Sequence, residues 1–172
     1  MTKKSPPVTV SRPELLDSDG RDTSFRAMVY DLLSVGARMQ DVRDRLAAII
    51  GVTGPQYAIL MAIAHVQDAE GGAGVRSVAR RLHVSGPFIT AQVNLLVKSD
   101  LVAKHPNPED GRGVILRLTP LGEEQLAAIE TEIQRANDTF FGPLSAEEFC
   151  RLAQLAARLE ESSELAVRSG GD

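Results

Sequence analysis

The stretch HPNPEDGRGVILRLTPLG, from His105 to Gly122, decides how the rest of the sequence is interpreted. Prolines, glycines and acidic residues crowd its first half, and the β-prone runs LVAKH and VILRL lie on either side of them. Such turn formers between two apolar runs predict a β-hairpin, with strands near residues 101–105 and 113–118 and Arg112 at the tip. Most of the remaining chain has helical periodicity, so a single hairpin in its middle needs an explanation.

The composition is that of a soluble globular protein. Hydrophobic residues make up 43% of the 172 residues and charged residues 24%, which suits one domain with its own core. With five Phe, two Tyr and no Trp, that core must be mostly aliphatic, which favours packed helices. We expect a disordered tail over residues 1–21, which show no apolar periodicity, and a single domain over residues 22–168.

Cysteine usage and the N-terminal residues indicate a cytoplasmic protein. Cys150 is the only cysteine, so no disulfide can form within the chain, as is usual in a reducing compartment. Lys3 and Lys4 are not followed by an apolar run, so we predict no signal peptide. No segment approaches the roughly 18 consecutive apolar residues of a membrane span, so we expect no membrane partner.

Apolar residues spaced three to four apart predict the helices. Two helices follow the hairpin: one has an apolar stripe ending at Phe140, and the other reaches about Ala166. The helices predicted before the hairpin cover about residues 23–50, 54–66, 75–82 and 86–99, and the last of these is expected to turn Ile89, Val93, Leu96 and Val97 inward. Hydroxyl residues stand where four of these helices begin and are predicted to be their N-caps: Thr53, Ser85, Thr119 and Ser145.

The short helix, a tight turn containing Gly86 and the helix after it make a helix-turn-helix. The second helix of such a pair fits the major groove, where outward side chains near its N-terminus meet base edges. Thr90 and Asn94 share its outward face; Asn can pair with adenine through two hydrogen bonds, and a Thr methyl can touch a thymine methyl. These positions are otherwise ordinary surface positions on a helix. The residues predicted to contact DNA are Ser77, Ser85, Pro87, Thr90, Ala91, Asn94, Lys98 and Arg112.

A hairpin directly after that second helix is the wing of a winged helix. Its tip can reach a neighbouring minor groove, whose negative potential attracts cations such as Arg112. Asp110 is predicted to steady Arg112 across the turn, and Gly111 and Gly113 allow the tight backbone. The alternative is a solvated turn in which Arg112 holds Asp110 and does nothing more.

Charge is distributed unevenly along the chain. The net charge is −4, yet residues 75–118 carry +4, so the remainder carries −8. A basic middle is typical of nucleic-acid binding. The negative total instead favours a second interpretation, in which the winged helix contacts only other proteins, as an adaptor or antagonist. Salt-sensitive DNA binding would separate the two.

The sequence from Ser77 to Gly122 resembles the core of the multiple-antibiotic-resistance regulator (MarR) family. The resemblance is close over about residues 70–122 and extends over 23–166 by the order and length of the helices. The family's pattern is Leu-Val, a short strand, a turn of the form D/N-P-x-D-x-R, a second strand and L-T-x-x-G. The matching residues are Leu101-Val102, Asn107-Pro108, Asp110, Arg112, Leu118-Thr119 and Gly122.

The chain departs from the family pattern at four positions. The family often has a basic residue where Gly111 stands and an Arg where Ala91 stands. A small hydroxyl residue often replaces Phe88, which we expect to pack in the core or against a helix rather than on a base. A Gly usually precedes the Leu-Val pair, where this chain has Asp100. Because these changes reduce positive charge, they bear on DNA affinity and operator sequence, since phosphate contacts set much of the affinity.

The terminal helices carry more apolar surface than one monomer can fold onto itself. The simplest solution, which the resemblance also implies, is a two-fold homodimer that binds a palindromic operator in double-stranded DNA. The fold class we predict is mainly α with a β-hairpin wing: a winged helix-turn-helix core at about 53–119 and dimerisation helices at about 23–50 and 120–168. The resemblance further implies a repressor that responds to a small aromatic or acidic ligand, without a cofactor.

Catalysis, metal binding and redox sensing have no support in the sequence. No Ser-His-Asp arrangement, phosphate loop or paired catalytic carboxylate stands out, so we expect no enzyme. His65, His83 and His105 share no ligand spacing, so no metal site is predicted. Cys150 lies in the last helix with no resolving partner nearby and is expected to be an inert, partly buried thiol.

Overall fold

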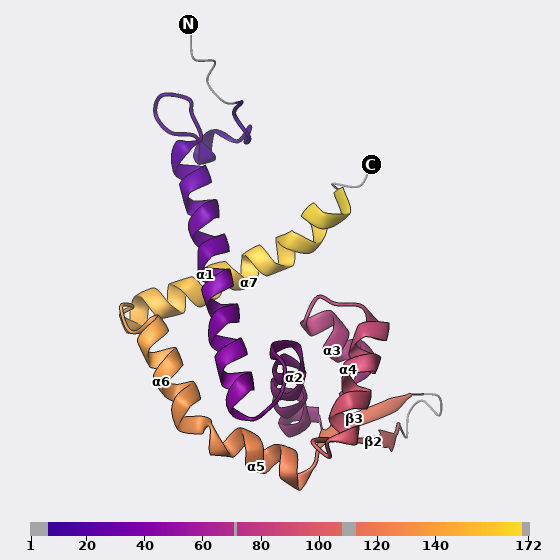
Figure 1. The fold of residues 1–172 in the computed structure, drawn as a ribbon. Helices are drawn as coiled ribbons and strands as arrows, with labels where there is room; N and C mark the ends of the chain where they lie inside the picture. Colours follow the sequence, from indigo (N-terminus) through magenta and orange to yellow (C-terminus); the bar gives the residue numbers. More distant parts are fainter. Residues whose placement is uncertain (1–6, 71, 108–112, 170–172) are drawn as a thin grey trace, which may run out of the picture. The chain divides into compact units, whose positions relative to one another are not determined.

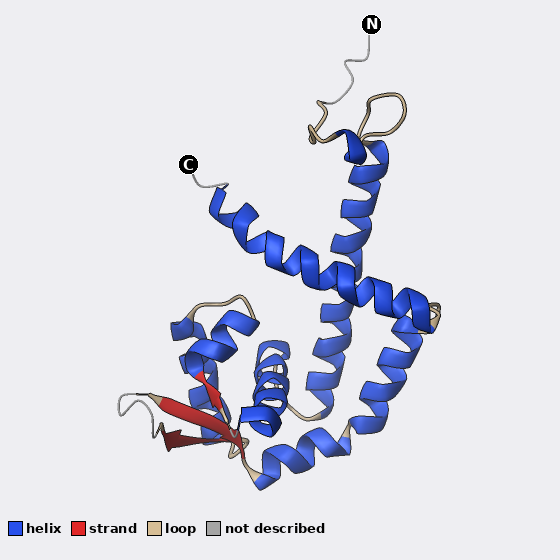
Figure 2. Ribbon diagram, turned by 180° about the vertical axis from the view of Figure 1, so that it is seen from behind, coloured by secondary structure: helices blue, strands red, loops and turns tan. Residues whose placement is uncertain are grey.

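The computed structural model describes residues 7–70, 72–107 and 113–169 (Figure 1). The chain forms two compact units, residues 1–123 and 124–172, and each is described by itself. Helices predominate and the strands form one small sheet (Figure 2), which confirms the predicted fold class. The elements of the first unit are the 3-10 turn η1 (Pro13–Leu15), α1 (Thr23–Ile49), α2 (Gly54–Glu70), β1 (Ala73–Gly74), α3 (Val75–Arg81), α4 (Gly86–Lys98), β2 (Val102–Pro106), β3 (Val114–Leu118) and the start of α5 (Pro120–Ala128).

The second unit contains the rest of α5, then α6 (Glu130–Phe141) and α7 (Ala146–Ser169). We predicted one continuous helix from Thr119 to Phe140. The structure breaks it at Ile129, whose φ of −108° and ψ of 12° are not helical. No Gly or Pro lies near this position, so the local sequence carries no signal for the break.

The hairpin is present as predicted, to within a residue at each end. β2 and β3 pair antiparallel, with Val102 opposite Leu118 and Pro106 opposite Val114. A third strand, β1, was missed: it pairs with β3 on the side away from β2, giving the order β1-β3-β2. A strand of two residues in a glycine-rich stretch is too short to show an alternation of apolar and polar side chains. Only its pairing with β3 makes it a strand.

The core of the first unit lies between α2, α3, α4 and the sheet. The helix faces predicted to point inward do so for the most part, but Val97 is 38% exposed and was wrongly placed in the core. Also, α2 extends to Glu70, past the predicted end near Val66. The fully buried side chains of this core include Ile59, Leu60, Ile63, Val78, Ile89, Val93, Leu96, Val102 and Leu116.

Helices α1, α3 and α4 end in the same hydrogen-bonded motif, which fixes the turn that follows each of them. After α4, the N–H of Asp100 donates to the Val97 carbonyl and the N–H of Leu101 to the Leu96 carbonyl, a Schellman motif with Asp100 in left-handed conformation (φ 56°). His83 plays the same part after α3 (φ 52°) and Gly51 after α1 (φ 71°). The helix-turn-helix turn is therefore set by a left-handed His83, one residue ahead of Val84.

All four predicted N-caps are confirmed. Ser85 Oγ accepts from the Phe88 N–H at 3.3 Å, and Thr119 Oγ1 accepts from the Gly122 N–H at 3.0 Å. Thr53 and Ser145 form capping boxes: Thr53 exchanges hydrogen bonds with Gln56, and Ser145 with Glu148. These hydrogen bonds hold the pKa of Glu148 below its usual value.

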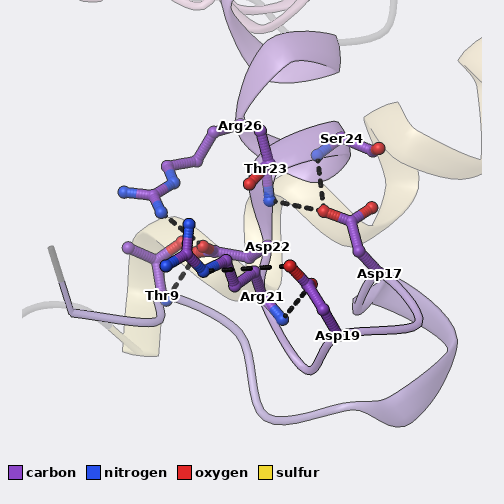
Figure 3. A network of polar contacts seen from close by, with 8 residues as sticks. All are labelled: Thr9, Asp17, Asp19, Arg21, Asp22, Thr23, Ser24 and Arg26. Carbon is purple, nitrogen blue, oxygen red and sulfur yellow. Dashed lines mark hydrogen bonds and ion pairs between the residues drawn. The ribbon is translucent and has the colours of Figure 1, made fainter. Parts of the chain in front are cut away.

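The described part of the N-terminal segment, residues 7–21, is more ordered than a disordered tail. Figure 3 shows its contacts with the start of α1. The Asp22 side chain is fully buried; its Oδ2 accepts from the Thr9 N–H at 2.7 Å, and its Oδ1 lies 2.6 Å from Nη2 of Arg26. Asp17 Oδ2 accepts from the N–H groups of Thr23 and Ser24, so it caps α1. Polar contacts made by Thr9 and Asp17 therefore hold this segment against the start of α1.

In the described residues no single helix is both long enough and apolar enough to span a membrane. Taken as a pair, α1 and residues 54–67 of α2 reach that length and composition, but the chain bends by 88° between them.

Candidate nucleic-acid interface

Helices α3 and α4 pack against each other across the predicted turn, and α4 is divided into two faces. One face buries Ile89, Val93 and Leu96. The other is open to solvent along the whole helix. The five residues of α4 predicted to contact DNA all lie on this exposed face: Pro87, Thr90, Ala91, Asn94 and Lys98.

The hydroxyl proton of Thr90 is already used inside α4. Its Oγ1 donates to the Gly86 carbonyl at 3.0 Å. The outward part of Thr90 therefore consists of its methyl group and the remaining oxygen lone pair, so it can accept a hydrogen bond or contact a thymine methyl.

Asn94 is joined to the wing. Nζ of Lys104, on β2, donates to Asn94 Oδ1 at 2.6 Å, and both side chains are exposed. The residues predicted to contact DNA did not include Lys104. The signal that was missed is that the first strand after a recognition helix runs back beside it, which α4 and β2 do.

The two predicted serines are positioned differently. Ser85 caps α4 and its side chain is exposed. Ser77 is half-buried, and its Oγ donates to the Gly74 carbonyl at 2.8 Å across the first turn of α3. The hydroxyl proton of Ser77 is thus satisfied within the protein, which leaves only its lone pairs for a further partner.

Phe88 does not lie in the core, which was one of the two places predicted for it; packing against a helix, the other, stays a prediction. Its side chain is 38% exposed beside Pro87 at the start of α4, because the inward positions of this helix begin one residue later, at Ile89. Cys150, on α7, is exposed rather than partly buried.

The cations of this region lie at the surface. Arg76, Arg80 and Arg81 on α3, Lys98 on α4 and the wing residues Lys104 and Arg117 are all exposed. Arg112, the predicted wing-tip contact, and Asp110, its predicted support, lie outside the described residues. The described residues contain no group of three or more His, Cys, Asp or Glu side chains that could hold a metal ion.

These features define a winged helix-turn-helix protein. A sequence model described as the MarR family matches residues 50–113. A protein described as a transcriptional regulator for the hcr operon of Thauera aromatica is 32% identical over 109 residues, which are 63% of this chain and 63% of that protein.

Solved structures agree in fold. PcaV from Streptomyces coelicolor, a transcriptional regulator solved in complex with its natural ligand, is 30% identical, with a TM-score of 0.57 over 74% of this chain and 90% of PcaV. A MarR variant from E. coli complexed with operator DNA is 20% identical, with a TM-score of 0.66 over 79% of this chain and 95% of that chain. The chain belongs to the MarR family, whose members are transcription regulators and not enzymes.

Proposed function

We propose that this protein is a cytoplasmic transcription repressor that binds a palindromic operator in double-stranded DNA as a homodimer. The observation that carries the proposal is the exposed face of α4, which lies beside a wing and is lined by Thr90, Ala91 and Asn94 with Lys98 at its end. A helix of this kind fits the major groove, and small or amide side chains at its start can approach base edges. Arg112 would contact the minor groove, and Asp110 would support it.

Homodimerisation is supported by the terminal helices. Large apolar side chains on α1 and α7 are exposed in a single chain, and so many exposed apolar groups mark an interaction surface. A two-fold dimer would cover them and set two copies of α4 about one DNA turn apart. The exposed apolar residues are Met28, Tyr30, Leu32, Leu33, Val35 and Ile49 on α1 and Phe149, Leu152, Leu155, Leu159, Leu165 and Val167 on α7.

Control by a small aromatic or acidic ligand completes the proposal. It is supported by the likeness to PcaV, which was solved with its natural ligand. Such a ligand acts by binding one dimer conformation more tightly than the other. The expected effect is release of DNA in the presence of the ligand.

Fluorescence anisotropy tests the proposal. The full-length protein is titrated onto labelled DNA from its own upstream region at several salt concentrations, with Arg112→Ala in parallel. We expect two chains to bind each duplex. The affinity should fall as the salt concentration rises, because each phosphate contact adds roughly 0.9 to the slope of log K against log salt concentration. Arg112→Ala should bind more weakly and with a shallower slope.

Two outcomes would change the proposal. Unaltered binding by Arg112→Ala would remove the role of the wing tip and keep the regulator. If no sequence from a random DNA library is enriched at any salt concentration, the winged helix does not bind DNA. A protein–protein module, with which the net charge of −4 agrees, would then replace the proposal.

A further inference from the structure

The contact between Lys104 and Asn94 fixes which atoms of the Asn94 amide face a DNA base. A lysine ammonium group has three N–H donors and no acceptor, so it can meet only the oxygen of the amide. The 2.6 Å distance from Nζ therefore assigns Oδ1 to the side of the wing and Nδ2 to the opposite side. The orientation of this amide follows from the chemistry of its partner.

This orientation changes what Asn94 can recognise. Two-point pairing of Asn with adenine needs Oδ1 to accept from the adenine amino group while Nδ2 donates to N7. In this protein Oδ1 already accepts from a cation. An adenine amino group would approach that oxygen beside the two remaining N–H groups of Lys104, so donor would face donor.

We propose that Asn94 and Lys104 act together as a composite reader with only hydrogen-bond donors outward, which selects guanine over adenine at one base pair of each half-site. Guanine presents two acceptors, N7 and O6, in the major groove, whereas adenine presents N7 and a competing donor. Nδ2 of Asn94 and a free N–H of Lys104 match the two guanine acceptors. The reader rests on the proposed DNA binding, and it makes Lys104 a specificity-determining residue.

The neighbouring residue supports the assignment. Thr90 lies one turn before Asn94 and has its hydroxyl proton bonded to Gly86, so Oγ1 faces outward as an acceptor. Cytosine is the base that offers only a donor, its N4 amino group, in the major groove. Adjacent acceptor and donor groups on α4 therefore fit the two sides of a G·C pair, or two neighbouring pairs.

In vitro selection from random double-stranded DNA tests the reader. The wild type, Asn94→Ala, Lys104→Met and Lys98→Met are selected in parallel, and thermal melting checks that each variant is folded. Asn94→Ala identifies the base pair concerned, as the one position where preference disappears. Lys98→Met is the matched control, because it removes one exposed cation from the same helix without touching Asn94.

We expect the wild type to select guanine at that position. Lys104→Met should shift the preference toward adenine by roughly tenfold, because Asn94 regains its acceptor and can then pair with adenine through two hydrogen bonds. Lys98→Met should weaken binding to all sequences alike. A 7-deazaguanine at the position should weaken the wild type and leave Asn94→Ala unaffected.

Selection of adenine by the wild type, or an unchanged base preference in Lys104→Met, would overturn the reader while DNA binding stands. Enrichment of no sequence by any of the four proteins would overturn the proposed function, and the reader with it.

Discussion

The first turn of α5 lies against the carbonyl oxygen of Leu101 so closely that only a hydrogen atom fits at Gly122. A Cβ atom at position 122 would lie 2.2 Å from that oxygen. The approach is held by Thr119, whose N–H donates to the same carbonyl at 3.2 Å and whose Oγ1 accepts from the Gly122 N–H. This geometry accounts for the L-T-x-x-G pattern: the Thr119 cap and Gly122 hold the first turn of α5 against the backbone of Leu101.

Gly122→Ala should destabilise the protein by about 1–3 kcal/mol, because helix or strand must shift to admit the methyl group. Urea unfolding followed by circular dichroism measures the change. Gly86→Ala is the control, since no atom lies within 4 Å of a Cβ there. Equal stability of the Gly122→Ala protein and the wild type would contradict the close approach.

Asp100→Gly should stabilise the protein by about 0.5–1 kcal/mol. The left-handed conformation at φ 56° costs an L-residue roughly 1–2 kcal/mol, and the greater freedom of glycine in the unfolded chain offsets about 0.4–1 kcal/mol of that gain. Asp100→Ala keeps the backbone strain and removes only the charge. A gain in Asp100→Ala as large as in Asp100→Gly would mean that charge, not conformation, limits stability here.

Gln67 joins α2 to the wing and to α5. Its Oε1 accepts from the Leu118 N–H at 2.8 Å, and its Nε2 donates to Glu123 at 2.9 Å. Gln67→Met should cost about 1–3 kcal/mol, because it leaves the N–H of a buried residue without its acceptor. Gln40→Met, which breaks only an exposed contact with Asp44, should change thermal stability little. Equal melting temperatures for the two variants would refute this role of Gln67.

The N-terminal segment should be released by acid. Hydrogen bonds from the Thr9 side chain and backbone, and the charge of Arg26, lower the pKa of Asp22 below 3.8. Because the folded-state pKa is depressed, the contact contributes stability above the unfolded pKa and loses it as the pH falls through the folded pKa. The amide proton shift of Thr9, followed by NMR, should therefore titrate with a midpoint below 3.8. A midpoint at or above that value would show that the carboxylate is not held this way, and Asp22→Asn should remove the titration.

Local signals in the sequence were sufficient where structure is decided locally. The N-caps Ser85 and Thr119, the hairpin and the inward residues Ile89 and Val93 were all predicted, because each depends on side chains within a few positions. The existence of β1 was not, because pairing with β3 creates that strand.

The candidate site was predictable in position but not in detail. Helical periodicity placed Thr90 and Asn94 on the exposed face of α4. It could not show that Thr90 bonds to Gly86 or that Lys104 reaches Asn94, because the second contact joins two elements. The exposure of Phe88 was missed because its apolar character outweighed its place one residue before the inward positions.

The most direct test of the central claim is the effect of Ala91→Glu on operator binding. Ala91 is exposed in the middle of the proposed DNA-binding face, and a carboxylate there would meet the negative charge of the DNA. Anisotropy should show at least a hundredfold loss of affinity for Ala91→Glu with an unchanged melting temperature, while Gln134→Glu, which adds the same charge on α6, should bind like the wild type. Undiminished binding by a folded Ala91→Glu protein would contradict the account, because α4 could not then lie in the major groove.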